Sequence, residues 1–312
     1  MTEKEKNKNL DKNLFEIIGP ETSEAEKLGR PQVSFLSDAW RRFKENKIAT
    51  VALFLLMIIG IMVIIGPWIS AHEYEVINRD RRNESPNADF WFGTDRLGRD
   101  LFSRTWQGGR VSLIIGIVGA FITAVAGSIY GGISGYFGGR VDDIMMRIVE
   151  VLISVPYLIV VILLSVVLNS KSLGTLLLAM TITGWTGMAR LVRGQVLQVK
   201  SQEFVMAAVG LGVRPWKIIR KHIIPNVLSV VIVSVTFQVP GFIFSEAFLS
   251  FIGLGIQPPE TSWGALAAAA QNIYTFYPYQ LFIPALMIAL TMLCFTLMGD
   301  GLRDALDPKL RK

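Results

Sequence analysis

Cysteine and histidine, two side chains that often carry catalytic and metal-binding chemistry, are rare in this 312-residue chain. It has one cysteine, Cys294, and two histidines, His72 and His222, which are predicted to lie on opposite sides of a membrane. These residues cannot form an internal disulfide, a thiolate metal cluster or a catalytic set around one substrate. No G-x-x-x-x-G-K-[ST] loop is present to hold the phosphates of a nucleotide. The sequence therefore predicts that the chain is not an enzyme, holds no metal and binds no cofactor itself.

Two polar side chains within the apolar stretches could contact a solute. Gln238 is the main strongly polar side chain at depth, and Glu246 lies at the predicted outer end of the same stretch, where it could cap a cavity. A single glutamine either cross-links helices or lines a pathway. Because charges are otherwise almost absent at depth, a proton- or sodium-driven mechanism is disfavoured. We expect solute to pass along uncharged surfaces, near Gln238, with energy supplied from outside this chain.

The segment 202–226, QEFVMAAVGLGVRPWKIIRKHIIPN, is basic, helix-forming and placed between two apolar stretches. It predicts two short helices. The first ends at Gly210 and Gly212, which can adopt the positive φ of a helix C-terminus. The second begins at Pro215, whose missing N–H is harmless at the first helical position.

Small residues in this segment leave its backbone open to close approach by another protein. Their spacing resembles the EAA loop of ABC importer permeases, in which E-A-A is followed by three residues, glycine, nine residues and I-x-L-P. Four residues match this pattern in register: Ala207, Ala208, Gly212 and Pro225. Met206 replaces the glutamate, His222 replaces the first isoleucine, and Ile224 stands in place of leucine.

In that family the loop docks into a groove on the ATPase subunit and carries its motion into the membrane. The resemblance therefore implies an ATPase-coupling site formed by Glu203, Met206, Ala207, Ala208, Gly212 and Pro225. The alternative is an ordinary amphipathic cytoplasmic loop.

The composition predicts an all-α, polytopic membrane protein. Hydrophobic residues make up 51% of the chain and charged residues 18%, and apolar runs of roughly 20 residues suit a helix that crosses a bilayer. Six transmembrane helices are expected, at 48–69, 111–135, 144–168, 173–188 with an extension towards 199, 227–245 and 281–298. Pro156 is expected to bend the third span. Small residues at every fourth position of the second span, Gly127, Gly131 and Gly135, predict close helix packing.

Positive charges place both the N- and the C-terminus in the cytoplasm. With that orientation, 23 of the 31 Lys and Arg lie in cytoplasmic segments and 8 in outer ones. The same topology, together with anionic lipid, accounts for the net charge of +6, so no nucleic-acid partner is expected.

This orientation divides the chain into three parts. We interpret 1–30 as a disordered cytoplasmic tail and 31–47 as an interfacial amphipathic helix in contact with membrane lipid. The remainder, 48–312, is interpreted as a transmembrane permease domain. Within it, 71–110 forms an outer loop and 200–226 the cytoplasmic coupling loop.

Three further motifs narrow the family: WFGTDRLGRDLFSR at 91–104, SEAFLSFIGLGIQPPETSWG at 245–264 and GDGLRDALDPKL at 299–310. With the 202–226 segment they resemble, over about residues 34–312, the C-type permease subunit of dipeptide, oligopeptide and nickel ABC importers. The resemblance implies a type I ABC importer permease fold and a multi-pass location in the cell membrane. It also implies four kinds of partner: a homologous B-type permease subunit, two ATPase subunits that bind ATP, an extracellular solute-binding protein, and membrane lipid.

The resemblance implies import of dipeptides or oligopeptides by alternating access. Two other functions stay open at this point. A nickel-chelate permease would share the same motifs. A stand-alone secondary carrier belongs to a different class and is commonly built from internal repeats with broken helices, which are not evident in this sequence.

Overall fold

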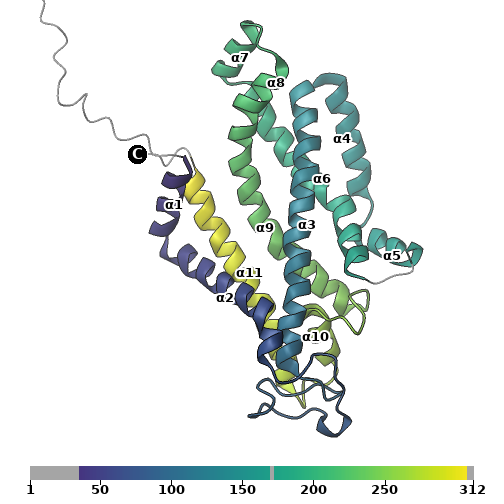
Figure 1. Cartoon of the computed structure of the whole chain (residues 1–312). Coiled ribbons are helices and arrows are strands. Elements are labelled where there is room, and N and C mark those ends of the chain that lie inside the picture. Colours follow the sequence, from purple (N-terminus) through teal and green to yellow (C-terminus); the bar gives the residue numbers. More distant parts are fainter. Residues whose placement is uncertain (1–34, 169–171, 308–312) are drawn as a thin grey trace, which may run out of the picture.

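The computed structural model describes residues 35–168 and 172–307, and this part of the chain is almost entirely helical (Figure 1). The α-helices are α1 (Phe35–Glu45), α2 (Lys47–Ile69), α3 (Leu101–Phe137), α4 (Gly139–Ser154), α5 (Tyr157–Val167), α6 (Leu173–Lys200), α7 (Glu203–Gly210), α8 (Pro215–Ile218), α9 (Ile224–Phe251), α10 (Trp263–Ala270) and α11 (Pro278–Leu306). A 3-10 turn, η2 (Arg79–Arg81), and a π-helical turn, η3 (Ile219–Ile223), complete the described elements.

Five stretches among the described residues are long and apolar enough to cross a membrane. They are α2, α3, α6, the stretch Pro215–Phe251 that includes α9, and α11. The helices α4 and α5 pass the same test only as a pair. The predicted all-α, polytopic class is confirmed, and the number of spans is six if this pair is one span.

The third span, predicted at 144–168 with a bend at Pro156, is a pair of helices bent by 80° at a short break. Val155 and Pro156 have extended backbone angles there, with ψ of 121° and 125°. Proline causes this break because it lacks an N–H and disfavours helical angles at the preceding residue. The position of the bend was therefore predicted correctly.

Three other spans are longer than predicted, and one of them is the sixth, predicted at 281–298, which is α11, Pro278–Leu306. The second span begins at Leu101 rather than at 111, because the carboxylate of Asp100 caps it by accepting hydrogen bonds from the backbone N–H groups of Phe102 and Ser103. The fifth span, predicted at 227–245, is the middle of the helical stretch Pro215–Phe251.

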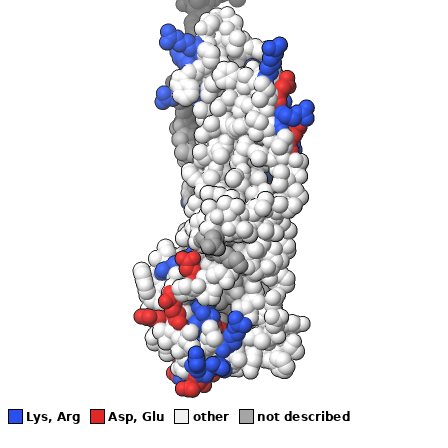
Figure 2. Space-filling view, turned by 90° about the vertical axis from the view of Figure 1, so that its right-hand side faces the viewer, with Lys and Arg blue, Asp and Glu red and all other residues white. Residues whose placement is uncertain are grey.

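Charged side chains gather at the two ends of the molecule and leave an uncharged band between them (Figure 2). One end carries α7 and α8, and the other carries α10 and the loop that follows α2 (Figure 1). Such a band is the surface expected to face hydrocarbon. We call the end with α7 and α8 the arm end, and the end with α10 and the loop after α2 the loop end.

The helix α3 is the centre of the bundle, because residues without side chains let two neighbours approach it. On one side, a Cβ on Gly127 would lie 2.6 Å from the Cβ of Met188 on α6. On another side, a Cβ on Gly116 would lie 2.9 Å from Ile243 on α9. The predicted packing role of the small residues in this span is confirmed.

The N-terminal helix α1 packs against the end of α11. Phe43 of α1 is buried with Ala49 of α2 and Ala305 of α11, while Trp40 is 50% exposed. Its apolar face is thus shared between protein and surroundings. The predicted tail 1–30 and the start of the predicted helix 31–47 lie outside the described residues.

The loop between α2 and α3 is folded by its own side chains. Asp95 accepts hydrogen bonds from the backbone N–H groups of Leu97 and Arg99, and Gly98 between them has a φ of +76°. Hydrogen bonds from the Arg81 guanidinium hold the pKa of the Glu84 carboxyl below its ordinary value. The motif at 91–104 is therefore a structural connection at the loop end.

The glycine packing of α3 predicts a sharp difference between two adjacent positions. Replacing Gly131 with Leu should destabilise the protein by about 1–3 kcal/mol or more, because its side chain would meet the backbone of Ala189 on α6. Replacing Gly132 with Leu is the matched control, since a Cβ there has no atom within 4 Å. Thermal unfolding in detergent measures the difference. Equal melting temperatures for the two variants would contradict this account of the bundle.

Candidate functional site

The segment 203–223 forms an arm of two short helices that projects at one end of the molecule (Figure 1). The first helix, α7, ends in a Schellman motif. The N–H of Gly212 donates to the carbonyl of Val209, and the N–H of Val213 donates to the carbonyl of Ala208. Gly212 has a φ of +72°, as the motif requires. Gly210 does not share this role: it is the last residue of α7 and has no positive φ.

The arm is fixed to the bundle by one apolar face. Val205 and Ala208 of α7 and Ile218 of α8 are buried against Val192 and Val196 of α6. Ala208, one of the predicted contact residues, therefore faces inward and supports the arm.

Four of the other predicted coupling residues lie on the opposite, exposed side of the arm: Glu203, Met206, Ala207 and Gly212. Pro225 is exposed as well, but it lies in the first turn of α9. Met206 is 55% exposed, and a Cβ on Gly212 would have no atom within 4 Å. The basic side chains of this segment are exposed as well: Arg214, Lys217, Arg220 and Lys221. The arm thus exposes small and apolar residues that are surrounded by basic side chains.

The arm continues into α9 without a loop. The second helix, α8, begins at Pro215 as predicted, and the turn η3 joins it to α9. In that turn the N–H of Ile224 donates to the carbonyl of Ile219, a π-type bond. The wider turn precedes Pro225, which has no N–H for an α-helical bond and whose ring would crowd the carbonyl one turn back. The helical backbone is therefore continuous from Pro215 into α9.

Gln238 both cross-links helices and lines a cavity. The Thr123 hydroxyl of α3 donates to its Oε1 atom over 2.7 Å, so its amide group is held in place. It also lines a cavity of about 460 Å³ beside α6, together with Gly184, Gly187 and Gly241. The two readings that the sequence left open are both compatible with this placement.

The structure corrects the placement of Glu246. This side chain is fully buried, and it lines neither of the cavities along α9. Its carboxylate accepts hydrogen bonds from the hydroxyls of Ser262 at 2.6 Å, Ser250 at 2.7 Å and Ser112 at 3.2 Å. The Ser112 hydroxyl in turn accepts from the backbone N–H of Trp263. Glu246 therefore ties α3, α9 and α10 together at the loop end instead of capping a cavity.

One interaction at the arm end was not predicted. The carboxylate of Asp142 on α4 forms an ion pair with Arg193 on α6 and accepts a hydrogen bond from Ser134 on α3. A second ion pair joins Arg147 and Glu150 within α4, with 2.9 Å between nitrogen and oxygen. The available signal for the missed pair was the group of basic residues in the second half of α6, Arg190, Arg193 and Lys200.

The sequence matches known families over most of its length. Residues 125–312 match the family described as "Binding-protein-dependent transport system inner membrane component". Residues 34–86 match the one described as "N-terminal TM domain of oligopeptide transport permease C". The fold, its spans and these matches define a class, the membrane subunit of an ABC importer. The chain belongs to the family of binding-protein-dependent transport system inner membrane components.

Individual proteins agree with this assignment. The dipeptide transport system permease protein DppC of Bacillus subtilis (strain 168) is 50% identical over 96% of this chain and 93% of its own length. The oligopeptide transport system permease protein OppC of the same organism is 49% identical over 97% and 99%.

A solved structure has the same fold. A chain of the MetNI methionine ABC transporter, in an inward-facing conformation, is similar with a TM-score of 0.53 at 18% identity. The match covers 65% of this chain and 94% of that one. The predicted ABC importer permease fold and the multi-pass membrane location are confirmed, as is the expectation that the chain is not an enzyme. A stand-alone carrier is contradicted by membership in this family.

The enclosure of Glu246 predicts that it has no part in proton transfer. Replacing it with Gln keeps an acceptor for the serine hydroxyls, so uptake by the assembled transporter should continue and resist a protonophore at constant ATP. Replacing it with Leu should lower stability by about 1–3 kcal/mol for each buried hydroxyl left without a partner. Uptake and melting temperature are the two measurements. This interpretation would be contradicted if uptake by the Glu246→Gln variant stopped when the proton gradient was removed at constant ATP.

Proposed function

We propose that this chain is the permease subunit of an ATP-driven importer of dipeptides or oligopeptides. The observation that carries the proposal is its near full-length identity, at 50% and 49%, to permeases of a dipeptide and an oligopeptide transport system. The uncharged surroundings of Gln238 are consistent with a solute whose side chains vary in charge, because a fixed charge at depth would favour one sign over the other.

The importer in this proposal has four further subunits. A homologous B-type permease completes the pathway, two ATPase subunits bind and hydrolyse ATP, and an extracellular solute-binding protein delivers the peptide. The arm end, and with it both termini, lies in the cytoplasm. The distribution of charge supports this orientation, since 23 of the 31 Lys and Arg lie in the segments that it places inside.

The arm is the proposed ATPase-coupling site. Glu203, Met206, Ala207 and Gly212 form its exposed side, where a groove of a partner could approach the backbone. The buried face and the π-type turn before Pro225 make the arm continuous with α9. ATP binding by the partner subunits then moves the arm, and α9 carries that movement into the membrane.

Transport by the reconstituted complex tests the solute class. Proteoliposomes that hold this chain with its partner permease, ATPase subunits and binding protein should take up a labelled dipeptide or oligopeptide when ATP is present on the arm side. Omission of the binding protein is the control, and should abolish the uptake. ATP-dependent uptake of a nickel chelate in place of every peptide tested would replace this proposal with the nickel alternative.

Gly212 offers a test of the coupling site that is independent of the solute. Its replacement with Val should lower transport and solute-stimulated ATP hydrolysis together, several-fold, because a positive φ costs an L-residue about 1–2 kcal/mol and the Schellman turn would distort. Membrane insertion should stay normal. Gly210, which is helical and equally uncrowded, is the matched position, and Val there should have a smaller effect. Undiminished coupled ATP hydrolysis in the Gly212 variant would contradict the assignment.

A further inference from the structure

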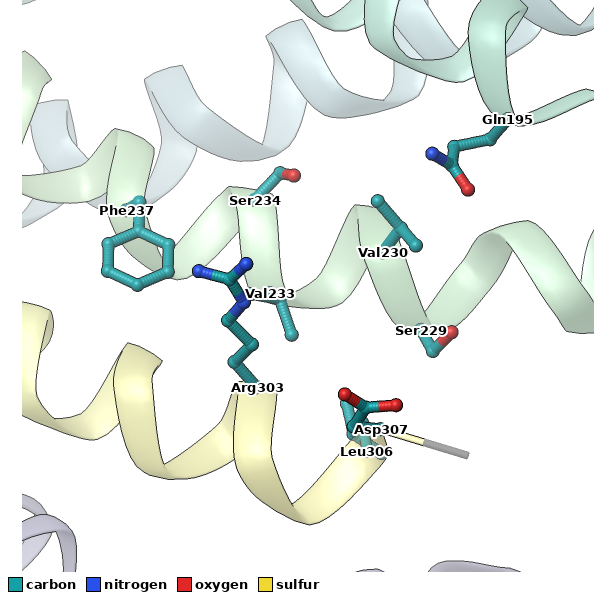
Figure 3. A pocket seen from close by; sticks show the side chains of 9 residues that line it. All are labelled: Gln195, Ser229, Val230, Val233, Ser234, Phe237, Arg303, Leu306 and Asp307. Carbon is teal, nitrogen blue, oxygen red and sulfur yellow. The ribbon is translucent and has the colours of Figure 1, made fainter. Parts of the chain in front are cut away.

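Two cavities lie along α9, one after the other. The deeper cavity, of about 460 Å³, is the one that Gln238 lines, between α9 and α6. The second, of about 450 Å³, opens nearer the arm, between α9, Gln195 of α6 and the end of α11. We call them the deep cavity and the arm-side cavity. Figure 3 shows the arm-side cavity, with the guanidinium of Arg303 extending from α11 towards Ser234 and Phe237 of α9.

The two cavities follow one another around α9. Every fourth residue lines one cavity or the other: Ser229, Val233, Phe237, Gly241 and Ser245. Each step of four residues turns by about 40° around the helix axis, so this row winds slowly around α9. Because Phe237 lines both cavities, they are successive parts of a single furrow that winds along α9.

The furrow mixes polar and apolar groups, whereas the neighbouring exposed face of α9 is apolar. The furrow carries hydroxyls, the Gln238 amide, glycines and, in the arm-side cavity, Arg303 and Asp307, beside apolar side chains such as Met180 and Phe242. The other face carries large apolar side chains, among them Leu228 at 50% and Phe244 at 57% exposure. Hydrocarbon favours the second face, and polar groups left without partners in hydrocarbon are costly. The furrow is thus the face of α9 suited to water and to a hydrated solute.

Phe237 is the residue that lines both cavities. Its ring reaches from α9 to α11, where the absence of a side chain on Gly299 makes room for it. A Cβ on Gly299 would lie 3.2 Å from the Cε1 and Cζ atoms of the ring. On the deep-cavity side of the ring, a Cβ added to Gly241 would have no atom within 4 Å. The furrow is open on each side of this ring and narrowed by it.

We propose that Phe237 is the constriction of a solute path along the α9 furrow. In the conformation described here, its ring separates the deep cavity, which holds Gln238, from the arm-side cavity. Solute passes when α9 moves relative to α11 and the ring leaves its position on Gly299. For the direction in which the solute moves, this proposal rests on the proposed transport function. It does not depend on which solute is carried.

Cysteine accessibility in the assembled transporter tests the constriction. Single cysteines are introduced by Ser234→Cys and Gly241→Cys in a chain in which Cys294 is replaced by Ala. A positively charged, membrane-impermeant methanethiosulfonate is then added from the arm side without nucleotide. Ser234→Cys should react at least tenfold faster than Gly241→Cys. Adding Phe237→Ala should raise the reaction rate of Gly241→Cys to within about twofold of that of Ser234→Cys. The rate of Ser234→Cys itself should not change.

Phe244→Ala is the matched control, because this phenylalanine lies on the exposed apolar face of the same helix. It should change neither rate. If Phe237→Ala does not assemble, Phe237→Leu should give an intermediate rate for Gly241→Cys. Equal rates at the two positions with Phe237 in place, or a Gly241→Cys rate that no Phe237 variant changes, would overturn the proposal.

Two surface positions show which side of the membrane each reagent reaches. Arg214→Cys on the arm should react from the arm side only, and Glu260→Cys, which is exposed at the loop end, from the other side only. These labels test the orientation separately. Since labelling requires no solute, a failure to transport peptide would leave the result on Phe237 intact.

Discussion

The structure depends on how closely α3 approaches its neighbours. Within a bilayer, apolar side chains gain little by leaving lipid for protein, so helices are held by close packing and by a few hydrogen bonds. Glycines give α3 two such contact surfaces, one for α6 near Gly127 and one for α9 near Gly116. The distance between α6 and α9 follows from these contacts. The furrow between them therefore exists because α3 sets its two walls apart at a fixed spacing.

Polar interactions complement this packing mainly at the two ends. At the loop end, Glu246 gathers serines from three parts of the chain, and at the arm end Asp142 pairs with Arg193. Between them, the bond from Thr123 to Gln238 joins α3 to α9. Acidic side chains thus hold the two ends together, and a pair of neutral groups joins α3 to α9 between them.

Local rules were sufficient for several of these features. Gly212 and Pro215 were predicted correctly because the ends of helices require particular backbone angles. The bend at Pro156 was predicted for the same reason, but its size was not, because 80° is set by what the two halves pack against. The start of α3 was missed because Arg104 and Arg110 look like loop residues. Both donate to backbone carbonyls of the region around the end of α2, and such contacts cannot be read from neighbours in sequence.

The candidate site shows the same difference between local features, which were predicted, and contacts between distant residues, which were not. Which residues of the arm are small or basic could be read directly, whereas the inward direction of Ala208 depends on α6. The burial of Glu246 was unpredictable because Ser112 and Ser262 are far from it in sequence, and serines carry no signal of pairing. The membrane location and the family followed from composition and motifs. The furrow needed the relative placement of α6, α9 and α11.

The absence of a loop between the arm and α9 has a mechanical consequence. Within α9, which begins at Ile224, the internal proline is Pro240, where a helical hydrogen bond is missing and bending is easiest. The part of α9 before it, 224–239, forms a lever roughly 24 Å long, at about 1.5 Å per residue. A tilt of about 10° about Pro240 would displace the arm-side end of α9 by roughly 4 Å, whereas Phe237, less than one turn from Pro240, would move by under about 1 Å. A movement at the arm would thereby become a small turn of the Phe237 ring away from Gly299.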